Sequence, residues 1–475
     1  MRLAQRAGAS IQMFHMNRAF NLEDVRHFAA VSGDTNPMHV DPLRARRMMF
    51  NRAVAHGMLL TLQSLEAILA TSPRSCEIAK LHAVYRSPVG IGENAKYSAE
   101  GAWPRWRFTV SLDGTSAVSG TVEFREREQA SGGNLPQPAV SEPSTLCDDD
   151  MTGQFGGELL ARIEGLDALL PMVADSLPAG QLSALLAVTR IVGMRCPGER
   201  SILSEVKLTF PEHTPTQLDW KVQKFDRRFA RVSIAASGAV QGEIVSFVRP
   251  VSPLERTAQD LRGVVRRDEF SGRTALIVGG TRGLGAAVAR VLSLGGASVT
   301  ATYRTGAQEA FALEREIHEA GGSIRFQSFD TADAAPASLF DSELTDLYYM
   351  ATPSIFRGRK GAISTALFEE FNAVFIDGFL KVFGAARTAS SALRYVLYPS
   401  SSVLSEPQPN LVEYAMSKQA AEEMIHALAA QYPALRFDLV RFPRLATDQT
   451  INLAGVPALD AADAALRALR GQPMS

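Results

Sequence analysis

The chain has few cysteines: Cys76, Cys147 and Cys196 are the only three among its 475 residues. They are far apart, odd in number and form no CxxC pair, which argues against a disulfide framework and against a cysteine-based zinc site. This usage is typical of a reducing compartment. We therefore expect a cytoplasmic protein without a metal site.

The chain also lacks an excess of charge of either sign. Lys and Arg together number 49 and Asp and Glu number 50, which gives a formal net charge of −1. Such a balance creates no field that would recruit nucleic acid or an anionic membrane. We expect no nucleic-acid partner, and local sites must determine what the protein binds.

No apolar run approaches the length of a membrane span, although 46% of the residues are hydrophobic. The first residues, MRLAQRAGASIQMF, contain two arginines but no apolar core of a secretion signal. These absences predict a soluble protein with no membrane span. The length of 475 residues predicts about three domains.

Shifts in composition mark the predicted domain boundaries. Residues 128–158 are rich in Pro, Ser, Gly and acid and poor in apolar periodicity, which predicts a linker. Residues 253–268 are charged and predict a helical connector, after which strands alternate with helices. The linker and the connector separate three predicted domains, at 1–127, 159–252 and 269–475.

The first two of these domains have the same order of predicted elements. In the first, the apolar helical run MLLTLQSLEAIL precedes the strand pattern IAKLHAVYRSPV, and three further alternating strands follow. In the second, LSALLAVTRIVG precedes SILSEVKLTF in the same way, again with three more strands. The sequence therefore predicts two copies of a unit in which a helix packs on a sheet.

Residues 31–41 read VSGDTNPMHVD and place two ionisable side chains, Asp34 and His39, five positions apart. One interpretation is structural: Ser32 and Asp34 cap a turn, and His39 is an ordinary surface histidine. The other is catalytic. A carboxylate and an imidazole can share the proton transfers that add or remove water across a double bond conjugated to a thioester.

The longer string FAAVSGDTNPMHVDPLRARRMMFNRAVAHGMLL resembles the signature of MaoC-like (R)-specific enoyl-thioester hydratases and dehydratases. The resemblance covers residues 12–127 and implies a hot-dog fold with Asp34 and His39 as the catalytic dyad. The HGM sequence starts an apolar helix, so the N–H of Gly57 is the candidate donor to the negative charge on the thioester oxygen. The second copy contains neither SGDxNPxH nor HGM, and we interpret it as a non-catalytic, structural half.

A glycine-rich turn follows the connector, in FSGRTALIVGGTRGLGAAVARVLSLGG. A strand precedes the turn and a helix follows it, so the glycines let the backbone approach a pyrophosphate at the helix N-terminus. The next strand ends in Arg304, where an acid would bind the ribose of NAD. A cation there, with Arg282 inside the turn, favours NADP(H).

Further along, Tyr414 and Lys418 have YxxxK spacing, with Ser401 before them. Alone, such a pair is usually part of an ordinary amphipathic helix. With the glycine turn it resembles the short-chain dehydrogenase/reductase family over residues 270–447. Because positions i and i+4 share a helix face, Lys418 can lower the pKa of the Tyr414 phenol and reach the nicotinamide ribose. Ser401 can hydrogen-bond the substrate carbonyl. The candidate cofactor-binding residues are Gly279, Thr281, Arg282, Gly283, Leu284, Gly285, Arg304, Asp330, Tyr414 and Lys418.

Two positions differ from the family pattern. YYMATPS, from Tyr348 to Ser354, stands in place of the family's NNAG, and Asp377 or Gly378 stands where an asparagine of the catalytic tetrad is expected. These differences are compatible with a slow reductase, an altered substrate, or a domain that binds the cofactor without turnover.

Together the two resemblances imply a multi-domain fold: an α+β double hot-dog followed by an α/β Rossmann domain with a doubly wound parallel sheet. A 3-oxoacyl reductase makes the 3-hydroxyacyl thioester from which a dehydratase removes water. We therefore hypothesise a bifunctional enzyme acting on thioesters of acyl carrier protein or CoA. One alternative keeps only the dehydratase active, and another is a non-catalytic acyl-binding or carrier-docking scaffold. Since the reductase family self-associates through long helices, we also expect a homo-oligomer.

Overall fold

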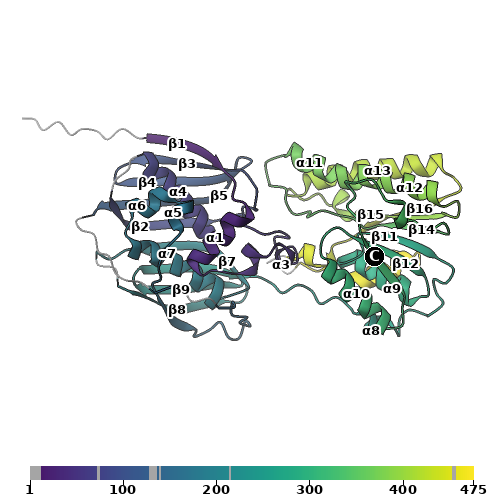
Figure 1. Ribbon diagram of the computed structural model, residues 1–475, viewed down its shortest axis with the longest axis horizontal. Helices are drawn as coiled ribbons and strands as arrows, with labels where there is room; N and C mark the ends of the chain where they lie inside the picture. The colour runs from purple at the N-terminus through teal and green to yellow at the C-terminus, as the bar shows by residue number, and fades with distance from the viewer. Residues whose placement is uncertain are drawn as a thin grey trace, which may run out of the picture. The chain divides into compact units, whose positions relative to one another are not determined.

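The computed structural model describes residues 12–71, 75–127, 136–137, 141–212, 215–451 and 456–474. The chain forms two compact units, the first reaching to Val251 and the second beginning at Ser252 (Figure 1). The residues predicted as a connector therefore belong to the second unit, and both copies of the repeated pattern lie in the first.

The first unit is built on one sheet of ten antiparallel strands, in the order β1-β3-β4-β5-β2-β7-β10-β9-β8-β6. The strands are β1 (Gln12–Arg18), β2 (Cys76–Tyr85), β3 (Ala95–Ala102), β4 (Arg105–Leu112), β5 (Thr115–Glu126), β6 (Phe155–Leu159), β7 (Ser201–Thr209), β8 (Gln217–Asp226), β9 (Arg231–Gly238) and β10 (Gln241–Val248). The helices are α1 (Leu22–Ser32), α2 (Pro37–Val40), α3 (Pro42–Ala45), α4 (Gly57–Thr71), α5 (Leu166–Leu169), α6 (Pro171–Ser176) and α7 (Ala179–Arg190), and a π-helical turn, Ile191–Arg195, continues α7.

The strand order reveals an internal repeat. Read inward from its two edges, the sheet runs β1-β3-β4-β5-β2 and β6-β8-β9-β10-β7, so corresponding strands occupy corresponding places. The two halves meet where β2 pairs with β7, with Leu81 opposite Leu208. The predicted fold is confirmed here as a hot-dog-like antiparallel sheet built from two similar halves.

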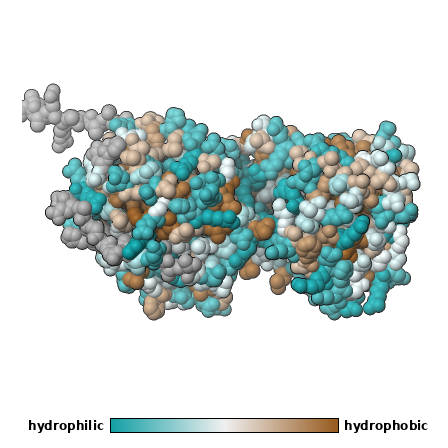
Figure 2. Space-filling model, in the orientation of Figure 1, coloured by the Kyte–Doolittle hydropathy of each residue, from teal (hydrophilic) through white to brown (hydrophobic). Residues whose placement is uncertain are grey.

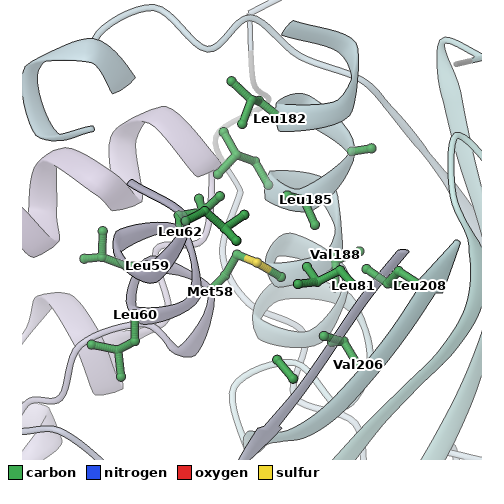
Figure 3. Close-up of a cluster of buried hydrophobic side chains, with 14 of the residues drawn as sticks. Met58, Leu59, Leu60, Leu62, Leu81, Leu182, Leu185, Val188, Val206 and Leu208 are labelled. Atoms are coloured by element: carbon green, nitrogen blue, oxygen red, sulfur yellow. The ribbon is translucent and has the colours of Figure 1, made fainter. Parts of the chain in front are cut away.

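The central helices of the two halves share one core. Helix α4 of the first half and α7 of the second are buried on nearly all sides, as expected for helices enclosed in a core. Figure 3 shows their side chains together with those of the central strands: Met58, Leu59, Leu60, Leu62, Leu81, Leu182, Leu185, Val188, Val206 and Leu208. Burial of one such side chain contributes roughly 1.5–3 kcal/mol. The shared core therefore ties the second half firmly to the first.

Strand β6 lies inside the segment predicted as a linker, 128–158. It pairs with β8, with Gly156 opposite Trp220. A Cβ atom on Gly156 would lie 3.0 Å from the Trp220 ring, so glycine allows the close approach of the two strands. The last four residues of the predicted linker, together with Leu159, thus form an edge strand.

The second unit contains a parallel sheet of six strands, in the order β13-β12-β11-β14-β15-β16. Its strands are β11 (Thr274–Val278), β12 (Ser298–Tyr303), β13 (Ile324–Ser328), β14 (Asp346–Tyr349), β15 (Tyr395–Ser401) and β16 (Arg436–Phe442), and a separate pair is β17 (Leu445–Ala446) with β18 (Leu459–Asp460). Its helices are α8 (Ala258–Leu261), α9 (Gly283–Leu294), α10 (Ala307–Glu319), α11 (Thr365–Asn372), α12 (Phe379–Ala389), α13 (Val412–Gln431) and α14 (Ala461–Leu469), with a π-helical segment, Ala373–Gly378, between α11 and α12.

Helices cover both faces of this parallel sheet. Ala275 and Ile277 of β11 pack with α9 and α14, whereas Leu276 and Val278 pack with α11, α12 and α13. Alternate residues of a strand face opposite sides, so β11 contributes to two cores. The predicted doubly wound Rossmann sheet is confirmed. Its strand order reverses between β11 and β14, which is where such sheets bind ligands.

The face of the protein shown in Figure 2 has hydrophilic and hydrophobic residues interspersed over both units. Within the described ranges, no helix combines the length and the apolar character that crossing a membrane requires.

Candidate functional site

The segment VSGDTNPMHVD folds as a series of short helices with their own caps. Helix α1 ends at Ser32 and is followed by Gly33, whose φ of 74° is left-handed and favours glycine. Asn36 caps α2 by accepting a hydrogen bond from the N–H of Met38 (3.1 Å). Asp34 lies between the helices, where its N–H donates to the Ser32 hydroxyl (3.2 Å), and His39 lies on α2.

The carboxylate of Asp34 is enclosed by protein groups and is 2% exposed. Its Oδ2 accepts a hydrogen bond from the hydroxyl of Thr189 (2.7 Å), and its Oδ1 accepts a longer one from the N–H of Asn36 (3.3 Å). Burial raises the pKa of Asp34, while the charge of His39 and the Thr189 hydrogen bond act against the rise. Asp34 thus makes a turn hydrogen bond, as the structural interpretation predicts, while its second oxygen is bonded to a distant residue in a buried site.

His39 is also buried and has one ring nitrogen available. Its Nδ1 lies 2.8 Å from the carbonyl oxygen of Val54. Because a carbonyl only accepts, Nδ1 carries the proton in the neutral ring and Nε2 remains a proton acceptor. Burial lowers the pKa of His39, and the charge of Asp34 opposes that shift. A neutral histidine with a free Nε2 suits a general base.

A second histidine, His56, completes the cluster. Its ring stacks on that of His39 with the centroids 3.8 Å apart, and its Nε2 donates to the backbone carbonyl of Asp34 (2.9 Å). Burial lowers its pKa well below the usual value. His56 thus supports His39 through one face and holds the Asp34 backbone in place. Gly57 follows as the first residue of α4, so no carbonyl within the helix accepts from its N–H, as an oxyanion donor requires.

Asp34, His39 and His56 also offer one ligand-type atom each within 4.8 Å of one another. That spacing could accommodate a metal ion, so the prediction of no metal site remains a prediction. Two of these groups are already engaged with carbonyl oxygens, because His39 bonds Val54 and His56 bonds Asp34. Each histidine keeps its other ring nitrogen, so the hydrogen bonds are compatible with an acid–base site and with a metal site.

The second half of the sheet contributes directly to this site. The side-chain amide of Asn36 lies within 3.2 Å of three carbonyl oxygens there, those of Gly193, Gly198 and Glu199. Arg190 donates to the carbonyl of Ser32 (2.9 Å). Sequence reasoning missed these residues of the second half because no catalytic motif surrounds them.

In the second unit, the glycine turn connects β11 to α9 as predicted. Gly279 has a φ of 85°, and its N–H donates to the hydroxyl of Thr302 (3.0 Å). A Cβ on Gly285 would lie 2.0 Å from the carbonyl oxygen of Gly279, so only glycine fits there. Thr281 lies in the turn and Leu284 in the first turn of α9. The tight turn ahead of a helix N-terminus fits a dinucleotide pyrophosphate.

Two charged residues proposed to bind the adenosine end of NADP(H), Arg304 and Asp330, lie close together. Arg304 follows the end of β12 and is largely exposed, with its Nε 4.0 Å from a carboxylate oxygen of Asp330. An exposed guanidinium at this edge fits the additional phosphate of NADP. The other candidate arginine, Arg282, instead donates to the buried carboxylate of Asp448 (3.2 Å).

A carboxylate that no sequence motif indicated lies at the glycine turn between β11 and α9. Glu255, from the predicted connector, accepts a hydrogen bond from the N–H of Gly283 (3.1 Å). Its other oxygen accepts from Arg290 (3.0 Å). This acid therefore occupies one N–H donor of the helix N-terminus that would face the phosphates of a cofactor.

Tyr414, Lys418 and Ser401 come together at the carboxyl end of β15. Burial raises the pKa of Tyr414 to about 12, and a hydrogen bond with Ser401 opposes the rise. The Lys418 ammonium donates to the carbonyl of Pro399 (2.8 Å) and lies 3.9 Å from the centroid of the Phe375 ring. Burial lowers the pKa of Lys418 to about 7. Tyr414 and Lys418 lie one turn apart on α13 and Ser401 ends β15, although the lysine is bonded to a strand carbonyl.

The two departures from the reductase pattern also lie side by side. Tyr349 ends β14, and its hydroxyl donates to the carbonyl of Val374 in the π-helical segment (2.6 Å). A Cβ on Gly378 would lie 2.6 Å from that same hydroxyl oxygen. Because the large Tyr349 fills this space, a residue with a side chain does not fit at position 378. Tyr349, from the first departure, therefore packs against the segment that contains the second.

Comparison with known families finds a match in each of the two units. A model described as "MaoC like domain" matches residues 7–102, and one described as "short chain dehydrogenase" matches residues 273–344. An (R)-specific enoyl-CoA hydratase from Rhodospirillum rubrum is 30% identical over 116 residues, which are 23% of this chain and 78% of that protein. A mitochondrial 3-hydroxyacyl-[acyl-carrier-protein] dehydratase from Arabidopsis thaliana is 40% identical over 77 residues. The match covers 16% of this chain, which spans only 45% of the plant protein's length.

Two similarities concern oxidoreductases. The 3beta-hydroxysteroid dehydrogenase 1 of Eggerthella lenta is 29% identical over 182 residues, 35% of this chain and 67% of that protein. A solved 3-oxoacyl (acyl-carrier-protein) reductase from Agrobacterium tumefaciens, with NADP bound, is 20% identical with a TM-score of 0.38, and the match covers 44% of this chain and 90% of that one. The chain therefore belongs to the MaoC-like dehydratase family through its N-terminal part and to the short-chain dehydrogenase/reductase family through its C-terminal part.

Proposed function

We propose that the first unit dehydrates 3-hydroxyacyl thioesters, or hydrates the corresponding enoyl thioesters, and that the second reduces 3-oxoacyl thioesters with NADPH. The observation that carries the proposal is the buried arrangement of Asp34 and His39. Both side chains are fixed by hydrogen bonds and have pKa values shifted by burial. Perturbed acid and base groups that are held side by side are typical of catalytic sites.

In the dehydration direction, the dyad moves the proton from C2 of the substrate to the hydroxyl on C3. The C3–O bond breaks, the hydroxyl leaves as water, and the C2–H electron pair forms the double bond. Nε2 of His39 is the free proton acceptor, and Asp34 hydrogen-bonds the hydroxyl. The N–H of Gly57, at the positive end of α4, stabilises the charge on the thioester oxygen. Hydration is the reverse of these steps.

In the second unit, Tyr414 donates its phenolic proton to the oxygen of the 3-oxo group, and Ser401 hydrogen-bonds that oxygen. NADPH, when bound, supplies the hydride. Lys418 stabilises the phenolate that remains and binds the ribose. The glycine turn with Thr281 and Leu284 would hold the pyrophosphate, whereas Arg304 and Asp330 would hold the adenosine phosphate and ring.

The two reactions are consecutive on one acyl chain, because the product of the reductase is the substrate of the dehydratase. The carrier is acyl carrier protein or CoA, both of which present the acyl group as the same kind of thioester. Joining the units in one chain raises the concentration of the intermediate near the second site.

A second candidate function keeps only the dehydratase active. Two observations favour it: Glu255 occupies the Gly283 N–H, and Lys418 is bonded to Pro399. The sequence adds Asp377 or Gly378 where the tetrad asparagine is expected. A third candidate, an acyl-binding scaffold without catalysis, requires that Asp34 and His39 perform no chemistry.

The test of the proposal is dehydration of 3-hydroxyacyl thioesters, on CoA and on acyl carrier protein, followed by mass spectrometry of the enoyl product. We expect Asp34→Asn and His39→Ala to lower the rate by about 10²–10⁴-fold. His15→Ala, which removes an exposed histidine of β1, is the matched control and should leave the rate unchanged. Activity that persists after a chelator is added excludes a metal-dependent route. Equal rates in wild type and both site variants would refute the proposal.

A further inference from the structure

The second half of the sheet lacks the catalytic motif, yet its central helix ends at the candidate dehydratase site. Helix α7 runs from Ala179 to Arg190 and corresponds to α4 of the first half. Its last turn carries Thr189, and the π-helical turn that follows carries Gly193. Both residues lie against Asp34.

The hydroxyl of Thr189 points at the carboxylate of Asp34. Its Oγ1 donates to Oδ2 at 2.7 Å, and the Thr189 side chain is buried, with 4% of the residue exposed. A threonine within a helix commonly bonds the carbonyl four residues earlier. Here the hydroxyl is directed out of its own helix and across the boundary between the two halves. A hydrogen bond to a charged acceptor in a buried site is among the stronger kinds.

The surrounding contacts fix this geometry. A Cβ on Gly193 would lie 2.2 Å from Oδ1 of Asp34, so the backbone of the π-helical turn closes the other side of the carboxylate. Arg190 donates to the carbonyl of Ser32 and forms an ion pair with Glu158 of β6 (2.8 Å). The same short segment of the second half thus bonds the backbone before Asp34, hydrogen-bonds Oδ2 and packs beside Oδ1.

We propose that Thr189 is a positioning residue for the dehydratase, which holds the Asp34 carboxylate in its reactive orientation. The inference rests on the proposed function of the Asp34–His39 site. The second half of the sheet then positions a catalytic side chain in addition to supporting the fold.

Other charged and titratable groups also face this carboxylate. His39 on α2 and His56 before α4 lie within the same cluster, and Arg190 is the nearby cation of α7. Arg249, after β10, acts on His39. Since the Thr189 hydrogen bond lowers the pKa of Asp34, removing it raises that pKa further. If the reaction needs ionised Asp34, then as the pH falls the variant loses activity at a higher pH than the wild type does.

The test compares Thr189→Val, which keeps the shape but removes the hydroxyl, with Thr189→Ser, which keeps the hydroxyl. The control is Ser183→Ala on the same helix, because the Ser183 hydroxyl accepts from Ala161 and lies away from the carboxylate. The measurements are kcat and KM for dehydration of a 3-hydroxyacyl-CoA across pH, with the melting temperature of each variant.

We expect Thr189→Val to lower kcat by about ten- to a hundredfold with little change in KM. The acid limb of its kcat profile should move to higher pH, and Thr189→Ser should restore both properties. Should the valine variant fail to fold, Thr189→Ala with the same readouts replaces it. An unchanged acid limb, or a loss that serine does not restore, would overturn the inference while the wild-type activity upholds the proposed function. A wild type that does not dehydrate any thioester would instead overturn the proposed function.

Discussion

The two candidate sites differ in the hydrogen-bond partners that the protein provides for their proposed reactive groups. In the first unit, Asp34 is held by Thr189 and Asn36, and His39 is held by Val54, so each catalytic group has fixed partners within the protein. In the second unit, the groups meant for a cofactor are engaged elsewhere. Lys418 is bonded to Pro399, and carboxylates bind the N–H of Gly283 and the side chain of Arg282.

This contrast suggests that the two sites depend on ligands to different extents. The candidate dehydratase site has its side chains fixed by protein groups, and such preorganisation is the usual source of electrostatic catalysis. At the candidate reductase site, the internal hydrogen bonds of Lys418, Gly283 and Arg282 must break before these groups can bond an anionic cofactor. Each bond that must break weakens the binding of the cofactor. We therefore expect the dehydratase to be the more robust activity, and the following variants either break or sharpen that contrast.

The largest expected effect is on reduction. Tyr414→Phe removes the proposed proton donor, so the rate of 3-oxoacyl thioester reduction should fall by about 10²–10⁴-fold. Stopped-flow measurement of NADPH oxidation gives the rate, and fluorescence titration of NADPH checks that binding persists. Tyr432→Phe, after the end of α13, is the matched control. An unaffected rate in the Tyr414 variant would refute its assignment.

A second prediction concerns the preorganised site. In Gly193→Ala, the new Cβ would lie 2.2 Å from Oδ1 of Asp34, so the carboxylate must move. Displacement of a catalytic group by about 1 Å costs about 10²-fold in rate, and we expect a loss of that order in dehydration. Gly384→Ala, where a Cβ would meet no other atom within 4 Å, serves as the control. Full dehydratase activity in Gly193→Ala would show that the second half does not constrain the site.

The smallest effect is expected at the cofactor turn. Glu255→Gln keeps an acceptor for the Gly283 N–H but removes a negative charge from beside the phosphates. NADPH should bind about two- to tenfold more tightly, as is typical of removing a like charge near a surface. Glu343→Gln, an exposed acid elsewhere in the unit, is the control in the same fluorescence titration. Weaker binding of NADPH to Glu255→Gln would indicate that this acid supports the glycine turn and does not compete with the cofactor phosphates.

The sequence predicted the parts of each site that a local motif encodes. Asp34 and His39 lie in one short segment, and Tyr414 and Lys418 lie one helical turn apart, so local structure brings each pair together. Both fold types were also predictable. In the first unit, several alternating strands follow each apolar helix, whereas in the second unit strands and helices alternate along the chain.

The remaining contacts could not be read from the sequence because they join distant segments. Thr189 reaches Asp34 from 155 residues away, and Glu255 reaches Gly283 from outside the predicted glycine turn. Nothing in the composition around Thr189 distinguishes it from other threonines in an apolar helix. The last residues of the predicted linker instead form part of β6, where Gly156 packs against Trp220.

The central claim is that one chain carries out both steps on a single acyl thioester. The direct measurement is mass spectrometry of a 3-oxoacyl thioester, on CoA and on acyl carrier protein, after incubation with the full chain and NADPH. The wild type should yield the enoyl thioester, His39→Ala should stop at the 3-hydroxyacyl thioester, and Tyr414→Phe should leave the 3-oxoacyl thioester unchanged. If the wild type returns the 3-oxoacyl thioester unchanged on both carriers, the claim of a bifunctional enzyme is contradicted.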